Sequence, residues 1–110
     1  MVNWTETGSS SANSAVTVTH AAATSTQHFV SDVTVSIRGA TAGNDMRVEI
    51  RDGSTVKWDT YIDAVRGLVL QEHFSSPIEI STGAAVNVVV AAGGSSVIAT
   101  VNVGGYSKSQ

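Results

Sequence analysis

The chain has 110 residues, close to the commonest size for one domain, and 42% of them are hydrophobic, enough for a single core. Six Lys and Arg stand against nine Asp and Glu, and the basic residues are scattered singly, so we expect no nucleic-acid partner. No apolar run approaches the roughly 18 to 20 residues that cross a bilayer, and there is no cysteine, so we expect no membrane span, no disulfide and no thiolate metal site.

The first segment, residues 1–14, is polar and ends in a linker-like stretch of Gly, Ser, Ala and Asn, which predicts an extended N-terminal arm outside the folded domain. Trp4 is the exception within it. A tryptophan is costly to leave in water and is a frequent interface anchor, so Trp4 either docks on a neighbouring molecule or folds back onto its own domain. We expect removal of 1–14 to leave a folded domain that no longer binds its partner.

The remaining residues, 15–110, predict one domain of short β-strands. In 27–38 apolar residues alternate with polar ones, the period of a strand with one buried face. Asp52-Gly53 separates two alternating runs, which predicts a hairpin. No window shows the spacing of an amphipathic helix. The expected strands are 15–20, 27–38, 46–51, 55–62, 68–74, 77–80, 85–91 and 96–103.

Eight short strands separated by turns favour two packed sheets, and this inventory is that of an eight-stranded antiparallel jelly-roll-like β-sandwich. Gly93-Gly94 is expected to close a second hairpin, between 85–91 and 96–103. Gly104-Gly105 is expected to form a further turn, because it lacks the Lys and the helix of a phosphate cradle.

Two of the expected strands, 85–91 and 96–103, are apolar on both faces. Val89 and Ile98 point away from the apolar side chains beside them in their own strands. A strand that is apolar on both faces is expected to be covered on both faces. Val89 and Ile98, together with Trp4, are therefore the candidate partner-interface residues.

No group of reactive residues predicts catalysis. The three histidines lack metal-ligand spacing, and the chain contains no Gly-x-Ser-x-Gly elbow. Several acidic residues fall on expected turns or strand ends, where Asp bonds to its own backbone and forms no calcium loop: Asp45, Asp52, Asp59 and Asp63. We expect a domain that binds and packs rather than an enzyme, with no catalytic residue, cofactor or metal.

Short motifs follow one another along residues 28–106: His28-Phe29-Val30, Ser36-Ile37-Arg38-Gly39, Val48-Glu49-Ile50-Arg51-Asp52-Gly53 with Trp58, Phe74-Ser75-Ser76-Pro77-Ile78, Ala92-Gly93-Gly94 and Val101-Asn102-Val103-Gly104-Gly105-Tyr106. Their order resembles a group of small virion proteins of tailed bacteriophages. The resemblance implies a jelly-roll capsid decoration, or cement, protein that is made in the host cytoplasm and sits on the outer capsid surface. Its implied partners are the major capsid protein and copies of itself, with a homotrimer among the oligomers considered.

Two alternatives stay open. Jelly rolls also serve as lectin domains, so the chain could instead be a carbohydrate-binding or host-attachment module of the phage tail. The small number of aromatic residues, 5% of the chain, weighs against that reading. The other alternative is a cellular sandwich domain with a protein partner.

Overall fold

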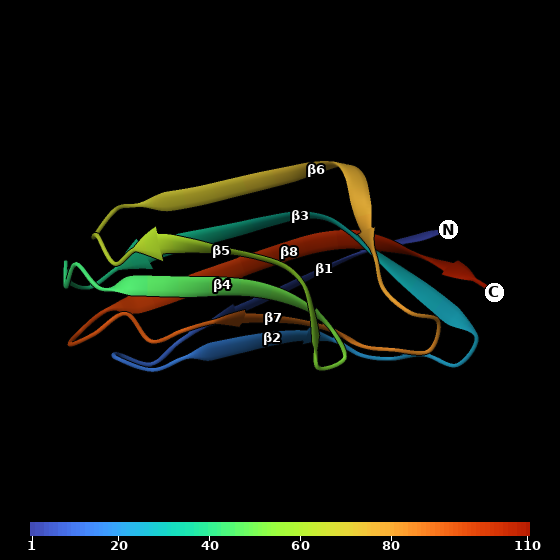
Figure 1. The fold of residues 1–110 in the computed structure, drawn as a ribbon, viewed down its shortest axis with the longest axis horizontal. Coiled ribbons are helices and arrows are strands. Elements are labelled where there is room, and N and C mark those ends of the chain that lie inside the picture. Colours follow the sequence, from blue (N-terminus) through green and yellow to red (C-terminus); the bar gives the residue numbers. More distant parts are fainter.

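The computed structural model describes all of residues 1–110 as eight β-strands joined by turns and loops (Figure 1). The strands are β1 (Val2–Ser9), β2 (Val16–His20), β3 (Thr26–Arg38), β4 (Asp45–Asp52), β5 (Thr55–Asp63), β6 (Val69–Glu79), β7 (Val86–Val90) and β8 (Ile98–Ser109). The structure contains no helix with the length and apolar character needed to span a membrane.

The strands form two antiparallel sheets that pack face to face. The first sheet has the order β1-β8-β3-β6, and the second has the order β2-β7-β4-β5. Along the chain, consecutive strands change sheet at every connection except the β4–β5 hairpin. This alternation is the jelly-roll arrangement, so the predicted all-β sandwich is confirmed.

The core lies between the two sheets and is built almost entirely of β-branched side chains. Because side chains alternate along a strand, every second residue of β3, β4, β7 and β8 points inward. The buried cluster consists of Val18, Val30, Val33, Val35, Ile37, Met46, Val48, Ile50, Ala64, Ile80, Val86, Val88, Val90, Val97, Ala99, Val101 and Val103.

The N-terminal segment is not a separate arm, which corrects the predicted boundary at residue 14. All eight residues of β1 pair with β8, from Val2 opposite Ser107 to Ser9 opposite Thr100. An edge strand tolerates many polar residues because one of its faces stays in water. Trp4, Glu6 and Gly8 form the inward face of β1, so only these residues have to pack against the interior of the sandwich.

The predicted number of strands is right, although two of its members differ. β1 is an additional strand, whereas the expected strands 68–74 and 77–80 are one continuous strand, β6. Pro77 is accommodated because β6 is the edge of the first sheet, where a missing N–H is tolerated.

The Asp52-Gly53 hairpin is confirmed by the pairing of Asp52 with Thr55. The hairpin expected at Gly93-Gly94 and the turn expected at Gly104-Gly105 are wrong. β7 and β8 belong to different sheets, so the loop at Gly93-Gly94 crosses between sheets and closes no hairpin. Gly104 and Gly105 lie in the middle of β8. A Cβ on Gly105 would clash with the Phe29 carbonyl oxygen and approach the Trp4 ring to 2.6 Å, so β8 needs glycine there for close packing.

The two sheets differ in length, and the difference leaves one end of the sandwich open. β3 and β8 have 13 and 12 residues, whereas β2 and β7 have five each. In Figure 1 the ends of β1, β3 and β8 near both termini run past the ends of β2 and β7. Beyond the end of β2 the first sheet faces the loop that follows β2, and a cleft lies at this end whose lining includes Trp4, Ala23 and His28.

Candidate functional site

The three predicted interface residues lie on three different surfaces. Trp4 points between the sheets from β1. Val89 lies on the outer face of the second sheet, where it pairs with Glu49, and Ile98 pairs with Arg38 at the start of β8 in the first sheet. All three are half-buried by their own chain. One continuous contact with a partner cannot use all three.

Trp4 lies at the open end of the sandwich, in a cleft of about 290 Å³ that we call the overhang cleft. Its walls include Val2, Trp4, His28 and Ser107 on the first sheet, and His20 at the end of β2. The indole stacks on the His20 ring at 4.1 Å between centroids, with 8° between the planes. Of the two alternatives for Trp4, the structure shows the second, in which it packs onto its own domain.

The stack is held in place by polar contacts of His20 and His28. The His20 Nδ1 lies 2.8 Å from a Glu6 carboxylate oxygen, which joins β2 to β1 across the sandwich. His28 is buried, and its Nε2 donates to the Ala21 carbonyl at 2.9 Å because a carbonyl can only accept. In the neutral ring Nδ1 then accepts from the Ser107 hydroxyl at 2.6 Å. The Trp4 indole N–H is buried without an acceptor.

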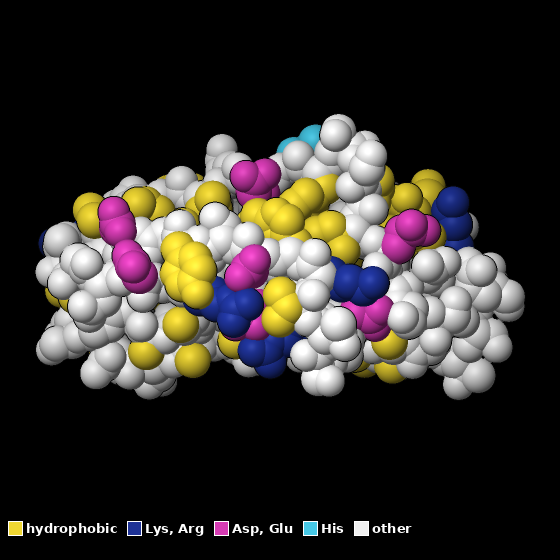
Figure 2. Space-filling model, in the orientation of Figure 1, with side chains coloured by type: hydrophobic (Ala, Val, Ile, Leu, Met, Phe, Trp, Pro, Cys, Tyr) yellow, Lys and Arg dark blue, Asp and Glu magenta, His cyan; other side chains and the backbone are white.

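A second candidate surface covers the outer face of β4 and β5. We call it the charged face and define it by Arg47, Glu49, Arg51, Asp59 and Tyr61. Arg47 stands opposite Tyr61 and Glu49 opposite Asp59 in the β4–β5 pairing, so these side chains form adjacent rows on one surface. Figure 2 shows basic, acidic and hydrophobic side chains intermixed over this part of the molecule.

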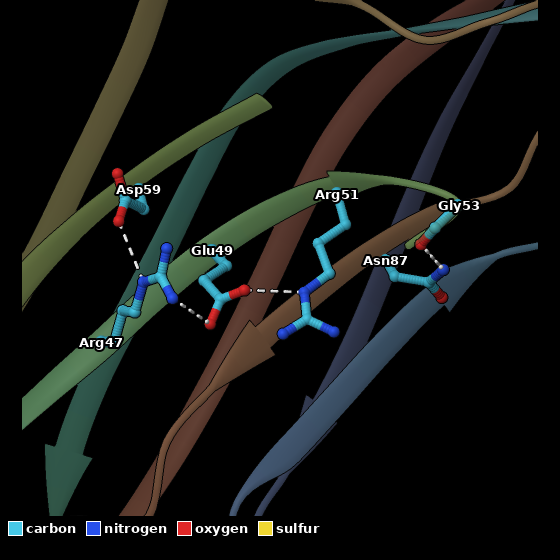
Figure 3. Close-up of polar contacts among 6 residues, drawn as sticks. All are labelled: Arg47, Glu49, Arg51, Gly53, Asp59 and Asn87. Atoms are coloured by element: carbon cyan, nitrogen blue, oxygen red, sulfur yellow. Dashed lines mark hydrogen bonds and ion pairs between the residues drawn. The ribbon is translucent and has the colours of Figure 1, made fainter. Parts of the chain in front are cut away.

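Ion pairs fix the side chains of the charged face relative to one another (Figure 3). Arg51 donates from Nε to Glu49 at 2.7 Å, and Arg47 donates from Nε to Asp59 at 2.9 Å. A second Arg47 nitrogen lies 3.4 Å from Glu49. Glu49 is therefore the shared carboxylate of two guanidinium groups, and each arginine keeps further N–H donors that are not used in these bonds.

The charges also perturb one another. The hydrogen bond from Arg51 lowers the pKa of Glu49 below its ordinary value, and this effect exceeds the opposing effect of desolvation. The hydrogen bond to Asp59 raises the pKa of Arg47 further above its ordinary value. Both groups are therefore held in their charged forms, which keeps strong donors and acceptors in fixed positions.

Tyr61 is the aromatic member of the charged face. Tyr61 is 62% exposed, whereas the other large aromatic residues are half-buried or buried in packing contacts. Trp58 packs edge-on against Phe74 at 5.3 Å, and Phe29 stacks on Tyr106 at 4.8 Å. Tyr61 is thus the aromatic ring most available for contact with a ligand.

The comparisons with known proteins support the fold. The sequence matches no protein-family model and no curated protein. Among solved structures, the chain is similar to dimeric latent PorU from Porphyromonas gingivalis, with 7% identity and a TM-score of 0.53 over 99% of this chain and 13% of that one. The chain therefore spans about an eighth of PorU.

Two carbohydrate-binding modules are also similar to the chain, at lower TM-scores. The CBM36-1 domain of a multidomain xylanase from the hindgut metagenome of Trinervitermes trinervoides has 20% identity and a TM-score of 0.44, over 87% of this chain and 74% of that one. A CBM36 module in complex with calcium and xylotriose has 18% identity and a TM-score of 0.40, over 86% of this chain and 73% of that one.

The charged face was not predicted from the sequence, although the sequence contains part of the pattern that forms it. Arg47, Glu49 and Arg51 alternate with apolar residues in 46–51, which places them on one side of a strand. The expectation that Asp59 serves a turn is wrong, because Asp59 lies in mid-β5 and binds Arg47. The missing information was the β4–β5 register, which no spacing within one strand reveals.

Proposed function

We propose that this domain is a non-catalytic carbohydrate-binding module and that the charged face is its binding surface. The observation that carries the proposal is the exposed Tyr61 ring beside a fixed array of guanidinium and carboxylate groups. Jelly rolls serve as lectin domains elsewhere, so the fold is compatible with this function.

The chemistry of the charged face suits a sugar ring. A pyranose has a face of C–H groups that packs on an aromatic ring, and hydroxyl groups that both donate and accept hydrogen bonds. Tyr61 offers the ring, the free N–H groups of Arg47 and Arg51 donate, and Asp59 accepts. Because the ion pairs already order these side chains, little further conformational entropy is lost on binding.

The first test is retardation of the protein in gels that contain soluble polysaccharides, namely xylan, mannan and mixed-linkage glucan, followed by calorimetry with the polymer that binds. We expect Tyr61→Ala to weaken binding at least tenfold, because the aromatic contact is lost while the exposed position leaves the fold intact.

The matched control is Tyr106→Ala, which removes a tyrosine from the first sheet, where it stacks on Phe29. This variant should bind as the wild type does. The proposal is wrong if no polysaccharide retards the wild-type protein, or if both tyrosine variants bind equally well.

Capsid decoration is the second candidate, and it is the role that the resemblance to tailed-phage virion proteins implies. The observation that favours it is the exposure of Met1 and Val2, 82% and 69%, at the end of an edge strand that a neighbouring subunit can cover. In this case the partner is the major capsid protein on the outer capsid surface. Binding of the purified protein to undecorated capsids, imaged as regular density over the lattice, would support this candidate.

A further inference from the structure

The sandwich has two open sides, and each side exposes the edge strands of both sheets. β1 and β2 form one side, where Glu6 meets His20, and β5 and β6 form the other, where Trp58 meets Phe74. The outer N–H and C=O groups of an edge strand can pair with a strand of another chain, so proteins usually protect such edges.

The β5–β6 side is protected in several recognised ways. The pairing of β5 with β4 is interrupted by a bulge next to Arg51, and the pairing of β6 with β3 is interrupted after Val30. β6 contains a proline, and the two strands carry many charges: Lys57, Asp59, Asp63, Glu72 and Glu79. Proline, bulges and charges all oppose pairing with another strand.

The β1 edge has none of these features. It pairs with β8 over eight residues in an unbroken register, and it contains no Lys, Arg or Pro. Its single ionisable side chain, Glu6, points inward and is occupied by His20. The other face of β1 carries the small polar side chains of Asn3, Thr5, Thr7 and Ser9. The contrast between the two sides indicates that β1 is kept free for pairing.

We infer that β1 pairs antiparallel with β1 of a second copy of this chain, joining the two first sheets into one eight-stranded sheet. A two-fold contact is self-complementary, and β1 has the neutral, regular edge that such a contact requires. A register centred on Thr5 places the exposed side chain of Val2 beside Gly8 of the partner subunit. Val18 and Val16 of the same chain already fill the space over Gly8, where an added Cβ would lie 2.9 Å from Val18, so Val2 would meet an apolar surface there.

This contact defines a dimer, in place of the homotrimer considered from the sequence. The area covered by one pair of eight-residue strands is small for a stable interface, so we expect a dissociation constant on the order of micromolar rather than nanomolar. The inference does not depend on the proposed sugar site, because β1 and the charged face share no residue.

Sedimentation of the full chain over a range of concentrations tests the inference. We expect the mass to rise with concentration from one to two copies of the 11.3 kDa chain. The double variant Asn3→Lys, Thr5→Lys brings like charges together across the two-fold axis and should weaken dimerisation at least tenfold. Gln71→Lys, on the exposed face of the β6 edge, is the matched control and should dimerise as the wild type does.

Amide hydrogen exchange of the wild-type protein gives a second readout that does not depend on the variants folding. Protection of the β1 amides should increase with protein concentration, while that of the β6 amides should not. A wild-type chain that stays monomeric at several hundred micromolar, a trimer, a dimer that the double lysine variant leaves intact, or β1 exchange that is independent of concentration would each overturn the inference.

Discussion

At the scale of single residues, Glu49 shows how a buried carboxylate can be tolerated on a sheet surface. Glu49 is 7% exposed, although it is not part of the apolar core. Two arginines of its own strand, Arg47 and Arg51, neutralise its charge. A buried carboxylate without such partners would be protonated or would destabilise the fold. The Glu49 charge therefore contributes to stability only while it is ionised.

The stability of the protein should accordingly depend on pH through Glu49. Its pKa is lowered in the folded state, so its contribution is fully present above the ordinary value of 4.5 and is lost as pH falls through the lowered folded value. We expect Glu49→Gln to reduce the free energy of unfolding at pH 7 by more than at pH 3. Urea unfolding of both proteins at these two pH values measures the difference, and an equal reduction at both would contradict this role.

Gly105 illustrates a residue whose importance comes from a close approach. A methyl group at this position would clash with the backbone of β3 and with the Trp4 indole. We expect Gly105→Ala to lower the free energy of unfolding by about 2 to 4 kcal/mol, as overpacking against backbone does. Gly104→Ala is the comparison, because the atoms nearest its new Cβ belong to the Asp32 side chain, which can move. Thermal unfolding should therefore show a clearly smaller loss for Gly104→Ala.

At the scale of elements, β1 contributes more to the domain than its polar sequence suggests. It covers one edge of β8 and supplies Trp4, which packs against the core and stacks on His20. The expectation that removal of residues 1–14 leaves a folded domain stays a prediction, and these contacts indicate that the removal lowers the stability of that domain.

Deletion of residues 1–9 should therefore destabilise the fold. We expect a loss of at least about 3 kcal/mol in the free energy of unfolding, because truncating one large packed aromatic already has an effect of that order. Urea unfolding of the shortened chain measures this loss, and Trp4→Ala in the full chain separates the share of the indole. An unchanged unfolding midpoint would show that β1 is dispensable.

At the scale of the whole molecule, the strand order of the jelly roll places the two surfaces that are proposed to bind, the charged face and the β1 edge, on different parts of the domain. The charged face lies on the β4–β5 side of the second sheet, whereas the free edge β1 lies on the opposite side of the first sheet. A two-fold axis that joins two antiparallel edge strands is perpendicular to the sheet. Both charged faces of a dimer would then point in the same direction, an arrangement that allows two sites to bind one polymer.

Much of the fold could be predicted from local patterns. The alternation of apolar and polar residues identifies the strands in 27–38 and 46–51, because every second side chain of a strand points to the same face. The Asp52-Gly53 pair identifies one hairpin, because a tight turn needs particular residues. These features depend on residues close together in sequence. The same alternation also places Val89 and the Arg47, Glu49 and Arg51 series on outward positions.

The tertiary structure alone decided which strands are neighbours, and with that the candidate sites. β1 was unrecognisable as a strand because only its pairing with β8, from Ser9 opposite Thr100 to Val2 opposite Ser107, makes its polar residues part of a sheet. Asp59 and Tyr61 joined the charged face through the β4–β5 register, and Trp4 met His20 because β1 and β2 lie at the same edge of the sandwich. Contacts of this kind are set by the packing of two sheets, and no spacing along the chain encodes them.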